Sequence, residues 1–194
     1  MGINGTGEIV GSYQDSSGNS HGFLDVSGSF DSIDFPGAVG TSASGINDAG
    51  EIVGNYLDSS GKTHGFSDVA GNFTSIDFPG ALSTFATGIN ASGQVVGWYV
   101  NAASAPASSG FLYSAGSFSS IQFPGAYSTS AQGINNNGQI SGSWEAVGGV
   151  SQGFVDTGGT FASLDFPGAF LTEAFGINDG GEVVGWAMLG SGKP

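Results

Sequence analysis

The chain repeats itself, and the repeat constrains its fold more than any other feature of the sequence. The tripeptide Gly-Ile-Asn begins at intervals of 43, 43, 45 and 43 residues, at Gly2, Gly45, Gly88, Gly133 and Gly176. We therefore divide the single repeat domain, 1–194, into units 2–44, 45–87, 88–132 and 133–175 and a partial fifth unit, 176–194. Tandem repeats of this length are typical of folds in which each unit buries its apolar face against the next.

Each unit is expected to contain four short strands. The second strand is the clearest, because β-branched residues alternate around a glycine in Glu-Ile-Val-Gly-Asn-Tyr-Leu, which begins at Glu51. The Asn-x-x-Gly turn at Asn47 predicts a hairpin with the small-residue strand before it. A Gly-Phe strand and a Phe-rich strand follow, and Phe-Pro-Gly-Ala, with proline at Pro79, predicts a type II turn at the exit.

Four antiparallel strands in each 43-residue unit is the size of one propeller blade. We predict an all-β fold, a β-propeller of four-stranded antiparallel blades with four full repeats and a partial fifth. The small-residue strands should lie nearest the axis and the Phe-rich strands outermost. The phenylalanines before the prolines should be buried at equivalent positions between blades, namely Phe35, Phe78, Phe123 and Phe166.

The two ends of the repeat are incomplete. The first unit begins at Gly-Ile-Asn without a full inner strand, whereas residues 171–188 supply an inner strand and a second strand and no more. Two arrangements are open. The last strands could close onto the first unit within one chain, which we favour, or pair with a neighbouring chain and build an oligomer or filament.

The charge balance excludes several classes of partner. Lys62 and Lys193 are the only basic residues apart from histidine, against 16 Asp and Glu, and the net charge is −14. Nucleic-acid backbones and anionic membranes both require clusters of Lys and Arg, so we expect neither as a partner. No apolar run approaches the ~18 residues of a membrane span, so we expect no membrane insertion. The absence of cysteine excludes disulfides and thiol chemistry.

The repeat resembles the bacterial repeat family called HAF, after a His-Ala-Phe tripeptide. The matching residues are His21-Gly22-Phe23, His64-Gly65-Phe66, and Ile46-Asn47 followed by Gly50-Glu51-Ile52-Val53-Gly54. Glycine stands in place of the family's alanine, and the third and fourth units lack the histidine. The resemblance covers essentially the whole chain and implies a propeller-like module at an extracellular or cell-surface location.

Candidate chemistry is sparse, and we do not expect an enzyme. His21 and His64 occupy equivalent places in two units, and no recurring set of acid, base and nucleophile accompanies them. They are candidate ligand-binding residues, with loop hydrogen bonding as the simpler interpretation. Asp34, Asp77 and Asp165, which precede Phe-Pro-Gly, are candidate calcium ligands. Calcium needs six to eight oxygens, and the Asp-Ser-Ser-Gly loops supply one carboxylate each, so an Asx turn is favoured there and no cofactor is certain.

Two tryptophans complete the candidate ligand-binding set. Trp98 and Trp186 share one repeat position, on the opposite parity from the apolar face of the strand. They could stack against sugar rings, contact another chain or pack internally. The sequence therefore favours a non-enzymatic structural or adhesive module that self-associates through its terminal strands. The alternative is a glycan-binding, lectin-like propeller with repeated pockets between blades.

Overall fold

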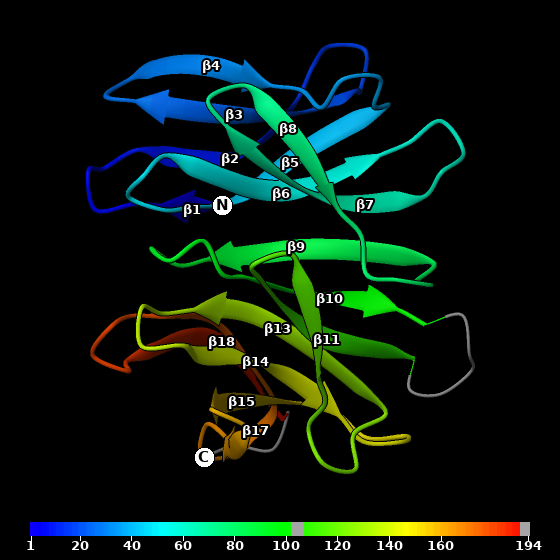
Figure 1. The fold of residues 1–194 in the computed structure, drawn as a ribbon. Coiled ribbons are helices and arrows are strands. Elements are labelled where there is room, and N and C mark those ends of the chain that lie inside the picture. The colour runs from blue at the N-terminus through cyan, green and yellow to red at the C-terminus, as the bar shows by residue number, and fades with distance from the viewer. Residues whose placement is uncertain (102–106, 191–194) are drawn as a thin grey trace.

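The chain folds into a row of antiparallel sheets. The computed structural model describes residues 1–101 and 107–190, and Figure 1 shows the first unit in blue at one end of the row and the last units in yellow to red at the other. The described residues form strands, turns and irregular segments, and no helix long and apolar enough to cross a membrane is found among them. The prediction of an all-β fold is confirmed.

The strands follow the repeat. After the first, each sheet begins 5–7 residues before a Gly-Ile-Asn, so from here on a unit is named by the sheet that it forms. The first unit contains β1 (Gly2–Ile3), β2 (Ile9–Gln14), β3 (Ser20–Val26) and β4 (Ser29–Ile33). The second contains β5 (Gly40–Ile46), β6 (Glu51–Leu57), β7 (Thr63–Val69) and β8 (Asn72–Ile76). The third contains β9 (Ser83–Ile89), β10 (Val95–Val100), β11 (Ser108–Ser114) and β12 (Ser117–Ile121). The fourth contains β13 (Ser128–Ile134), β14 (Gln139–Glu145), β15 (Ser151–Thr157) and β16 (Thr160–Leu164), and the partial fifth contains β17 (Ala169–Ile177) and β18 (Val183–Leu189).

Within each full unit the four strands pair antiparallel in chain order. The first strands of successive units contact one another in a row, β1 to β5, β5 to β9, β9 to β13 and β13 to β17. These small-residue strands contact one another through the whole row, and we call them the inner strands. One feature was not expected, because Ser108 of β11 and Ser128 of β13 form a parallel pair that joins the third and fourth sheets at one point.

The turns form as the sequence predicts. In the second unit, Asn47 accepts backbone N–H bonds from Ala49 and Glu51 on its Oδ1 atom, at 3.1 and 3.0 Å. In Phe-Pro-Gly-Ala, the Ala81 N–H donates to the Phe78 carbonyl at 3.1 Å, and Gly80 has a positive φ of 77°. A type II turn requires positive φ at its third residue, which glycine adopts without a steric cost.

The core lies between successive units, in layers built from both neighbours. Between the first two units, Val10 and Ile33 meet Ile52 and Phe66 of the next sheet. The same layer recurs between the second and third units and between the third and fourth. The Gly-Phe strand supplies the residues at its centre, since Phe66, Phe111 and Phe154 are each 0% exposed.

The prediction for the phenylalanines before proline was partly wrong. Phe35, Phe78 and Phe123 are half-buried, and Phe166 is 56% exposed. These rings lie at the rim of each layer, where three of them stack on an aromatic ring of the next unit. The stacked pairs, with centroids 3.6–4.1 Å apart, are Phe35–Tyr56, Phe78–Tyr99 and Phe123–Trp144. Phe166 has no such partner because Ala187 occupies the aromatic position.

The favoured closure of the two ends was also wrong for the described residues. β17 pairs with β18, and neither strand forms a ladder with a first-unit strand there. The first unit instead has an inner strand of its own, the short β1, in which Gly2 lies opposite Val10 of β2. The row of units therefore remains open in this structure.

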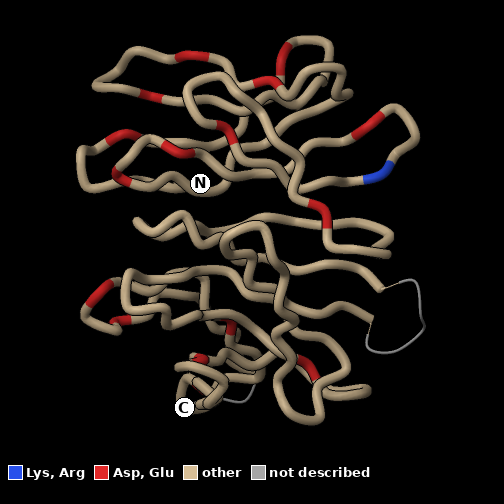
Figure 2. The backbone as a smooth tube through the Cα atoms, in the orientation of Figure 1, with Lys and Arg blue, Asp and Glu red and all other residues tan. Residues whose placement is uncertain are grey.

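Acidic residues are distributed over the turns and strand ends (Figure 2). Lys62 is the one Lys or Arg within the described residues. The surface therefore carries a negative field that repels anionic ligands.

Candidate functional site

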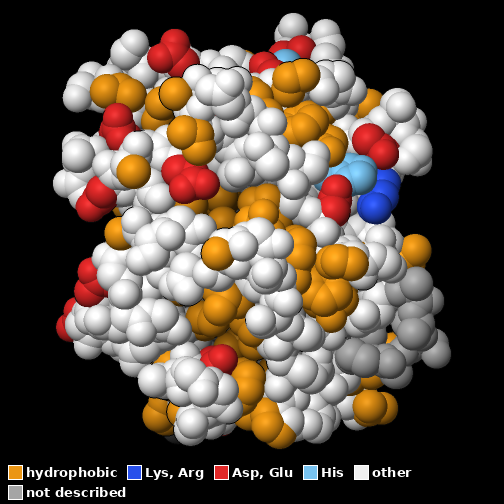
Figure 3. Space-filling view, viewed as in Figure 1, with side chains coloured by type: hydrophobic (Ala, Val, Ile, Leu, Met, Phe, Trp, Pro, Cys, Tyr) orange, Lys and Arg blue, Asp and Glu red, His pale blue; other side chains and the backbone are white. Residues whose placement is uncertain are grey.

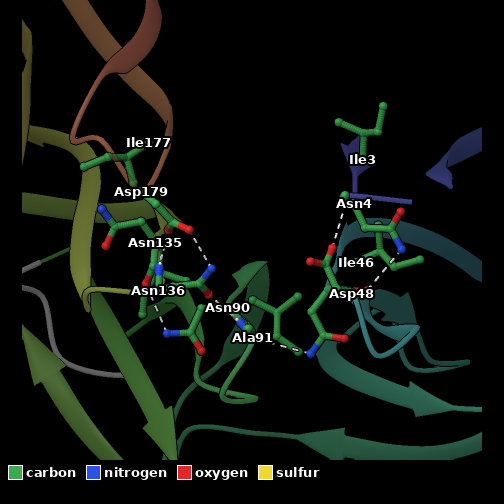
Figure 4. Close-up of a pocket in the computed structure, with 14 residues that line it drawn as sticks. Ile3, Asn4, Ile46, Asp48, Asn90, Ala91, Asn135, Asn136, Ile177 and Asp179 are labelled. Carbon is green, nitrogen blue, oxygen red and sulfur yellow. Dashed lines mark hydrogen bonds between the residues drawn. The ribbon is translucent and has the colours of Figure 1, made fainter. Parts of the chain in front are cut away.

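Residues from all five inner strands surround a small axial pocket of about 160 Å³. Figure 4 shows Ile3 and Asn4 at one end of an arc around this pocket and Ile177 and Asp179 at the other. One asparagine from each unit links it to the next, because its Nδ2 donates to the backbone carbonyl of the following asparagine. These bonds, of 2.9–3.2 Å, run from Asn4 to Asn47, Asn47 to Asn90, Asn90 to Asn135 and Asn135 to Asn178.

A second set of bonds lies beside this asparagine ladder. The Asp48 carboxylate accepts the Gly5 N–H at 2.6 Å, and the Asp179 carboxylate accepts the Asn136 N–H at 2.8 Å. The Asn136 bonds hold the pKa of Asp179 below its usual range. These polar groups already bond one another, so we assign the axial pocket a structural role in joining the units. The candidate ligand site is therefore sought elsewhere.

A larger groove opens between the first and second units, and we call it the first groove. It has a volume of about 370 Å³ and lies where the start of β3 faces β5 and β6. Its lining combines hydroxyl and amide groups with one aromatic ring and two aliphatic side chains, Val39 and Leu57, and carries no carboxylate. The residues that matter here are Asn19, Ser20, Gly40, Ser42, Asn55 and Tyr56.

Gly40 is the residue that leaves room for the first groove. A Cβ built at Gly40 would lie 3.5 Å from Ser20 of the first unit, which is an ordinary contact distance, so a side chain there would extend into the groove. The equivalent positions of the later units carry Ser83, Ser128 and Leu171. The repeat is therefore least filled at this point in the second unit.

Tyr56 forms the aromatic part of the first groove and is fixed on both faces. It stacks on Phe35 with centroids 3.7 Å apart and on His64 at 4.8 Å. Its hydroxyl lies 2.8 Å from the Ser75 Oγ. The edge of this ring faces the groove, and the ring is already fixed before a ligand binds. Binding therefore costs little further side-chain conformational entropy, which favours affinity.

The two histidines lie on one face of the molecule, each beside acidic side chains (Figure 3). His64 Nδ1 is 2.9 Å from Asp77 and Nε2 is 3.1 Å from Asp58. His21 makes the equivalent contacts, with Nδ1 2.7 Å from Asp34 and Nε2 3.5 Å from Asp15. Both nitrogens of each ring are thus occupied by carboxylates, which leaves neither nitrogen free to take a proton from a nucleophile.

These contacts shift the pKa values of the groups involved. The hydrogen bond that His21 donates to the Asp34 carboxylate raises the pKa of His21. Bonds from the Asn19 side chain and backbone lower the pKa of Asp15 to about 2. Asp15 also accepts the Ser17 N–H at 2.8 Å, which is the Asx turn expected for the Asp-Ser-Ser-Gly loop. The histidines therefore brace the outer loops, which is the simpler of the two interpretations of the sequence.

The three candidate calcium ligands are not brought together. Asp34 and Asp77 bind the histidine of their own unit, and Asp165 lies 3.5 Å from the Ser163 hydroxyl. No group of three or more His, Asp or Glu side chains suited to a metal ion occurs in 1–101 and 107–190. Calcium would therefore have to bind without a preformed site among these residues.

The two candidate tryptophans are in different surroundings. Trp98 is half-buried and stacks on Phe85 with centroids 3.9 Å apart. Trp186 is 42% exposed, and its indole N–H donates to the Glu173 carboxylate at 2.8 Å. In the second unit the equivalent residue is Asn55, which lines the first groove. The two tryptophans themselves do not lie in one shared site.

The sequence allowed pockets between blades in its alternative interpretation, but it did not locate the first groove, and it missed the asparagine ladder. The groove depends on Ser20 of one unit facing Gly40 of the next. Local sequence patterns do not predict such a contact between units. The ladder had a usable signal, since Asn recurs with Gly-Ile in every unit, but the recurrence was fully explained by the hairpin turn. The axial bond of the same side chain joins two units, so it could be identified only from their arrangement in the structure.

No family model matches this sequence, and no curated protein matches it. Solved structures do match its fold. AofleA from Arthrobotrys oligospora aligns at TM-score 0.55 and 13% identity over 94% of this chain and 63% of that chain. A mutant of AofleA with three arginines replaced by alanine aligns at TM-score 0.54 and 14% identity over 96% and 64%.

The Aleuria aurantia lectin (AAL), as an asparagine-to-glutamine mutant in complex with alpha-methyl-L-fucoside, aligns at TM-score 0.52 and 14% identity over 97% of this chain and 72% of that chain. The chain spans less than two thirds of the length of the AofleA chains. At identities of 13–14%, these likenesses show a shared all-β fold.

Proposed function

We propose that this protein binds neutral carbohydrate, with the first groove as a binding site. The observation that carries the proposal is the groove of about 370 Å³, open to solvent and lined by uncharged hydrogen-bonding groups around Tyr56. A sugar ring has hydroxyls at its rim and apolar C–H groups on its faces. Ser20 and Ser42 offer both donors and acceptors to the hydroxyls, and Asn55 offers its Nδ2, since its Oδ1 already accepts the Ala86 N–H at 2.8 Å. The edge of Tyr56 and the side chains of Val39 and Leu57 supply apolar surface for the C–H groups.

The charge of the protein selects among sugars. A net charge of −14 raises the free energy of bringing an acidic sugar to this surface. No arginine is present, so a ligand that needs a bidentate guanidinium has no partner here. The proposed ligand is therefore an uncharged hexose or deoxyhexose.

The fold supports the same proposal. We interpret the five inner strands around one axial pocket as part of a β-propeller, with each four-stranded sheet as a blade and β17–β18 as half of a fifth. AAL, which shares the fold, was solved with a fucoside bound. The groove between two blades is a concave site formed by rigid strands, as small-ligand sites commonly are. An extracellular location, as implied by the resemblance to HAF repeats, belongs to this proposal.

The competing function is a structural or adhesive module without a small ligand. The carbohydrate-binding and structural functions differ in whether the first groove must stay unfilled. A purely structural module does not require an open groove. A variant that fills the groove while leaving the blade contacts intact therefore separates them.

The test is an array of neutral and acidic glycans, probed with and without calcium, using the wild-type chain and three variants. Gly40→Leu fills the groove with the side chain that the fifth unit carries at this position, Leu171. Gly40→Ser introduces the smaller residue of the third and fourth units and should retain binding. Ser83→Leu places the same leucine in the third unit, away from the groove.

The proposal predicts that neutral glycans bind the wild type and Ser83→Leu, and that Gly40→Leu loses at least about tenfold in affinity at an unchanged melting temperature. Binding that is equal in all four proteins would place the sugar elsewhere. An array with no bound neutral glycan would leave the structural module as the better account.

A further inference from the structure

A second groove lies between the first and second units and has a volume of about 400 Å³. Its walls come from β3 and β4 on one side and from β6 and the β7–β8 hairpin on the other. It shares no lining residue with the first groove. Its lining combines carboxylates with apolar side chains, and those that matter here are Asp31, Asp34 and Asp68 with Leu24, Ile52 and Phe73.

Asp68 is the most unusual residue in the second groove. Its exposed fraction is 7%, and its Oδ1 atom has no hydrogen-bond partner among the described residues. Burial raises the pKa of Asp68, and the Gly71 N–H offsets that rise only in part. A buried carboxylate with an unused acceptor is costly unless a donor or a cation lies beside it. The wall of the groove therefore contains an acceptor that the described residues leave unsatisfied.

The other units show that packing does not require this set of carboxylates. The position of Asp31 is occupied in the later units by Thr74, Ser119 and Ala162. Asp68 aligns with Tyr113 in the third unit. At the next two junctions between units, the equivalent positions hold one carboxylate each, Asp77 and Asp156. The junction of the first and second units therefore differs from the others in its charge and not in its fold.

The make-up of the second groove indicates which ligand chemistry fits. Within 1–101 and 107–190 no three acidic side chains are grouped closely enough to hold a metal ion, so the carboxylates do not form a metal cage. An ammonium group has three donors for carboxylate oxygens, and a short alkyl chain attached to it suits apolar walls such as Leu24 and Phe73. The net charge of −14 attracts cations to the surface.

We propose that the second groove binds a primary alkylammonium group, carried by a free aliphatic diamine or by a lysine side chain of a partner protein. The ammonium donates to the Asp68 carboxylate, and its methylenes lie against Leu24 and Phe73. His21 Nδ1 already lies 2.7 Å from Asp34, so Asp34 adds negative charge to the groove and Asp31 is the second acceptor.

The test is a titration of the full labelled chain, followed by backbone amide and carboxyl shifts, in about 0.15 M salt to screen general attraction to the acidic surface. The probes are cadaverine, acetyl-lysine methylamide, the neutral isostere pentanediol, and calcium chloride. Asp68→Asn removes the charge and keeps the shape. Asp31→Ser introduces the residue of the third unit, Ser119. Asp25→Asn is the matched control, because it changes the net charge equally at the equivalent position of the first unit, outside the groove.

The proposal predicts saturable shifts with an amine probe, confined to 24, 31–34, 50–52 and 68–73. Affinity should fall at least about tenfold in Asp68→Asn and about threefold in Asp31→Ser, with Asp25→Asn unchanged. Binding of cadaverine alone supports a free amine as the ligand, and equal binding of the lysine derivative supports a lysine of a partner.

The absence of shifts with both amines up to about 10 mM overturns the proposal. Binding of pentanediol or calcium with the affinity of the amines also overturns it, as does an equal loss of affinity in Asp25→Asn and Asp68→Asn. These outcomes do not depend on sugar binding by the first groove, because the two grooves have separate linings.

Discussion

The side-chain amide of Asn47 donates a hydrogen bond to the backbone carbonyl of Asn90, 3.2 Å away, although the two residues stand 43 positions apart. The same side chain forms the hairpin turn of its own unit through its Oδ1 atom. One residue type therefore sets a local turn and holds neighbouring units together at the axis. This double use explains why asparagine recurs at the end of every inner strand.

The ladder predicts that Asn90→Asp destabilises the protein. Aspartate keeps the acceptor that holds the turn but removes the donors to Gln94 and to the Asn135 carbonyl. We expect a loss of about 1–3 kcal/mol in the free energy of unfolding, measured by urea denaturation, because Asn90 is buried. Gln94→Leu is the control, since it removes only the local bond from Asn90 to Gln94 and leaves the axial donor to the Asn135 carbonyl in place. Equal losses in the two variants would show that the axial bonds contribute nothing.

The interunit layers predict a contrast between two phenylalanines. Phe66→Ala leaves a cavity in a fully buried layer and should cost about 3–5 kcal/mol. Phe166→Ala removes an exposed ring and should cost less than about 1 kcal/mol. Thermal and urea unfolding measure both, and a larger loss for Phe166→Ala would contradict the assigned burial.

Burial at Asp156 predicts a pH-dependent stability. Desolvation raises the pKa of this carboxyl, so its contribution to stability is fully present below the ordinary value of 3.8 and is lost as pH rises through the higher folded value. Asp156→Asn keeps an acceptor for the Gly159 N–H and removes the charge. The variant should unfold at a higher temperature than the wild type at pH 7, and the difference should vanish near pH 3. Asp25→Asn, at the more exposed equivalent position, should show a smaller gain.

The histidine contacts predict a change that nuclear magnetic resonance can follow. Asp34→Asn replaces the carboxylate that raises the pKa of His21 with a neutral amide, so the His21 pKa should fall toward 6.5. Because the raised value stabilises the fold below about pH 6.5 and that effect is lost as pH rises through the folded value, the variant should lose stability mainly in acid. Asp165→Asn, whose unit carries Gln152 in place of the histidine, should leave His21 unchanged. A His21 titration that is identical in all three proteins would refute the pairing.

The repeat allowed the local structure to be predicted, because turns depend on residues close together in the chain. Asn47 and Pro79 each specified a hydrogen-bonding pattern that the structure contains. Contacts between units were predicted less well. Phe166 was expected to be buried by analogy with Phe78, and Ala187 removes the ring against which it would stack. The first groove escaped prediction for a similar reason, since Gly40 matters only through Ser20 of another unit.

Titration of methyl α-L-fucoside into labelled protein, followed by the backbone amide shifts, tests the central claim most directly. The account predicts saturable shifts confined to 18–20, 39–42 and 55–57, and their loss in Gly40→Leu with retention in Ser83→Leu. The absence of any shift at about 10 mM fucoside, together with no response to other neutral hexoses, would contradict carbohydrate binding by the first groove. Shifts that persist unchanged in Gly40→Leu would contradict it equally.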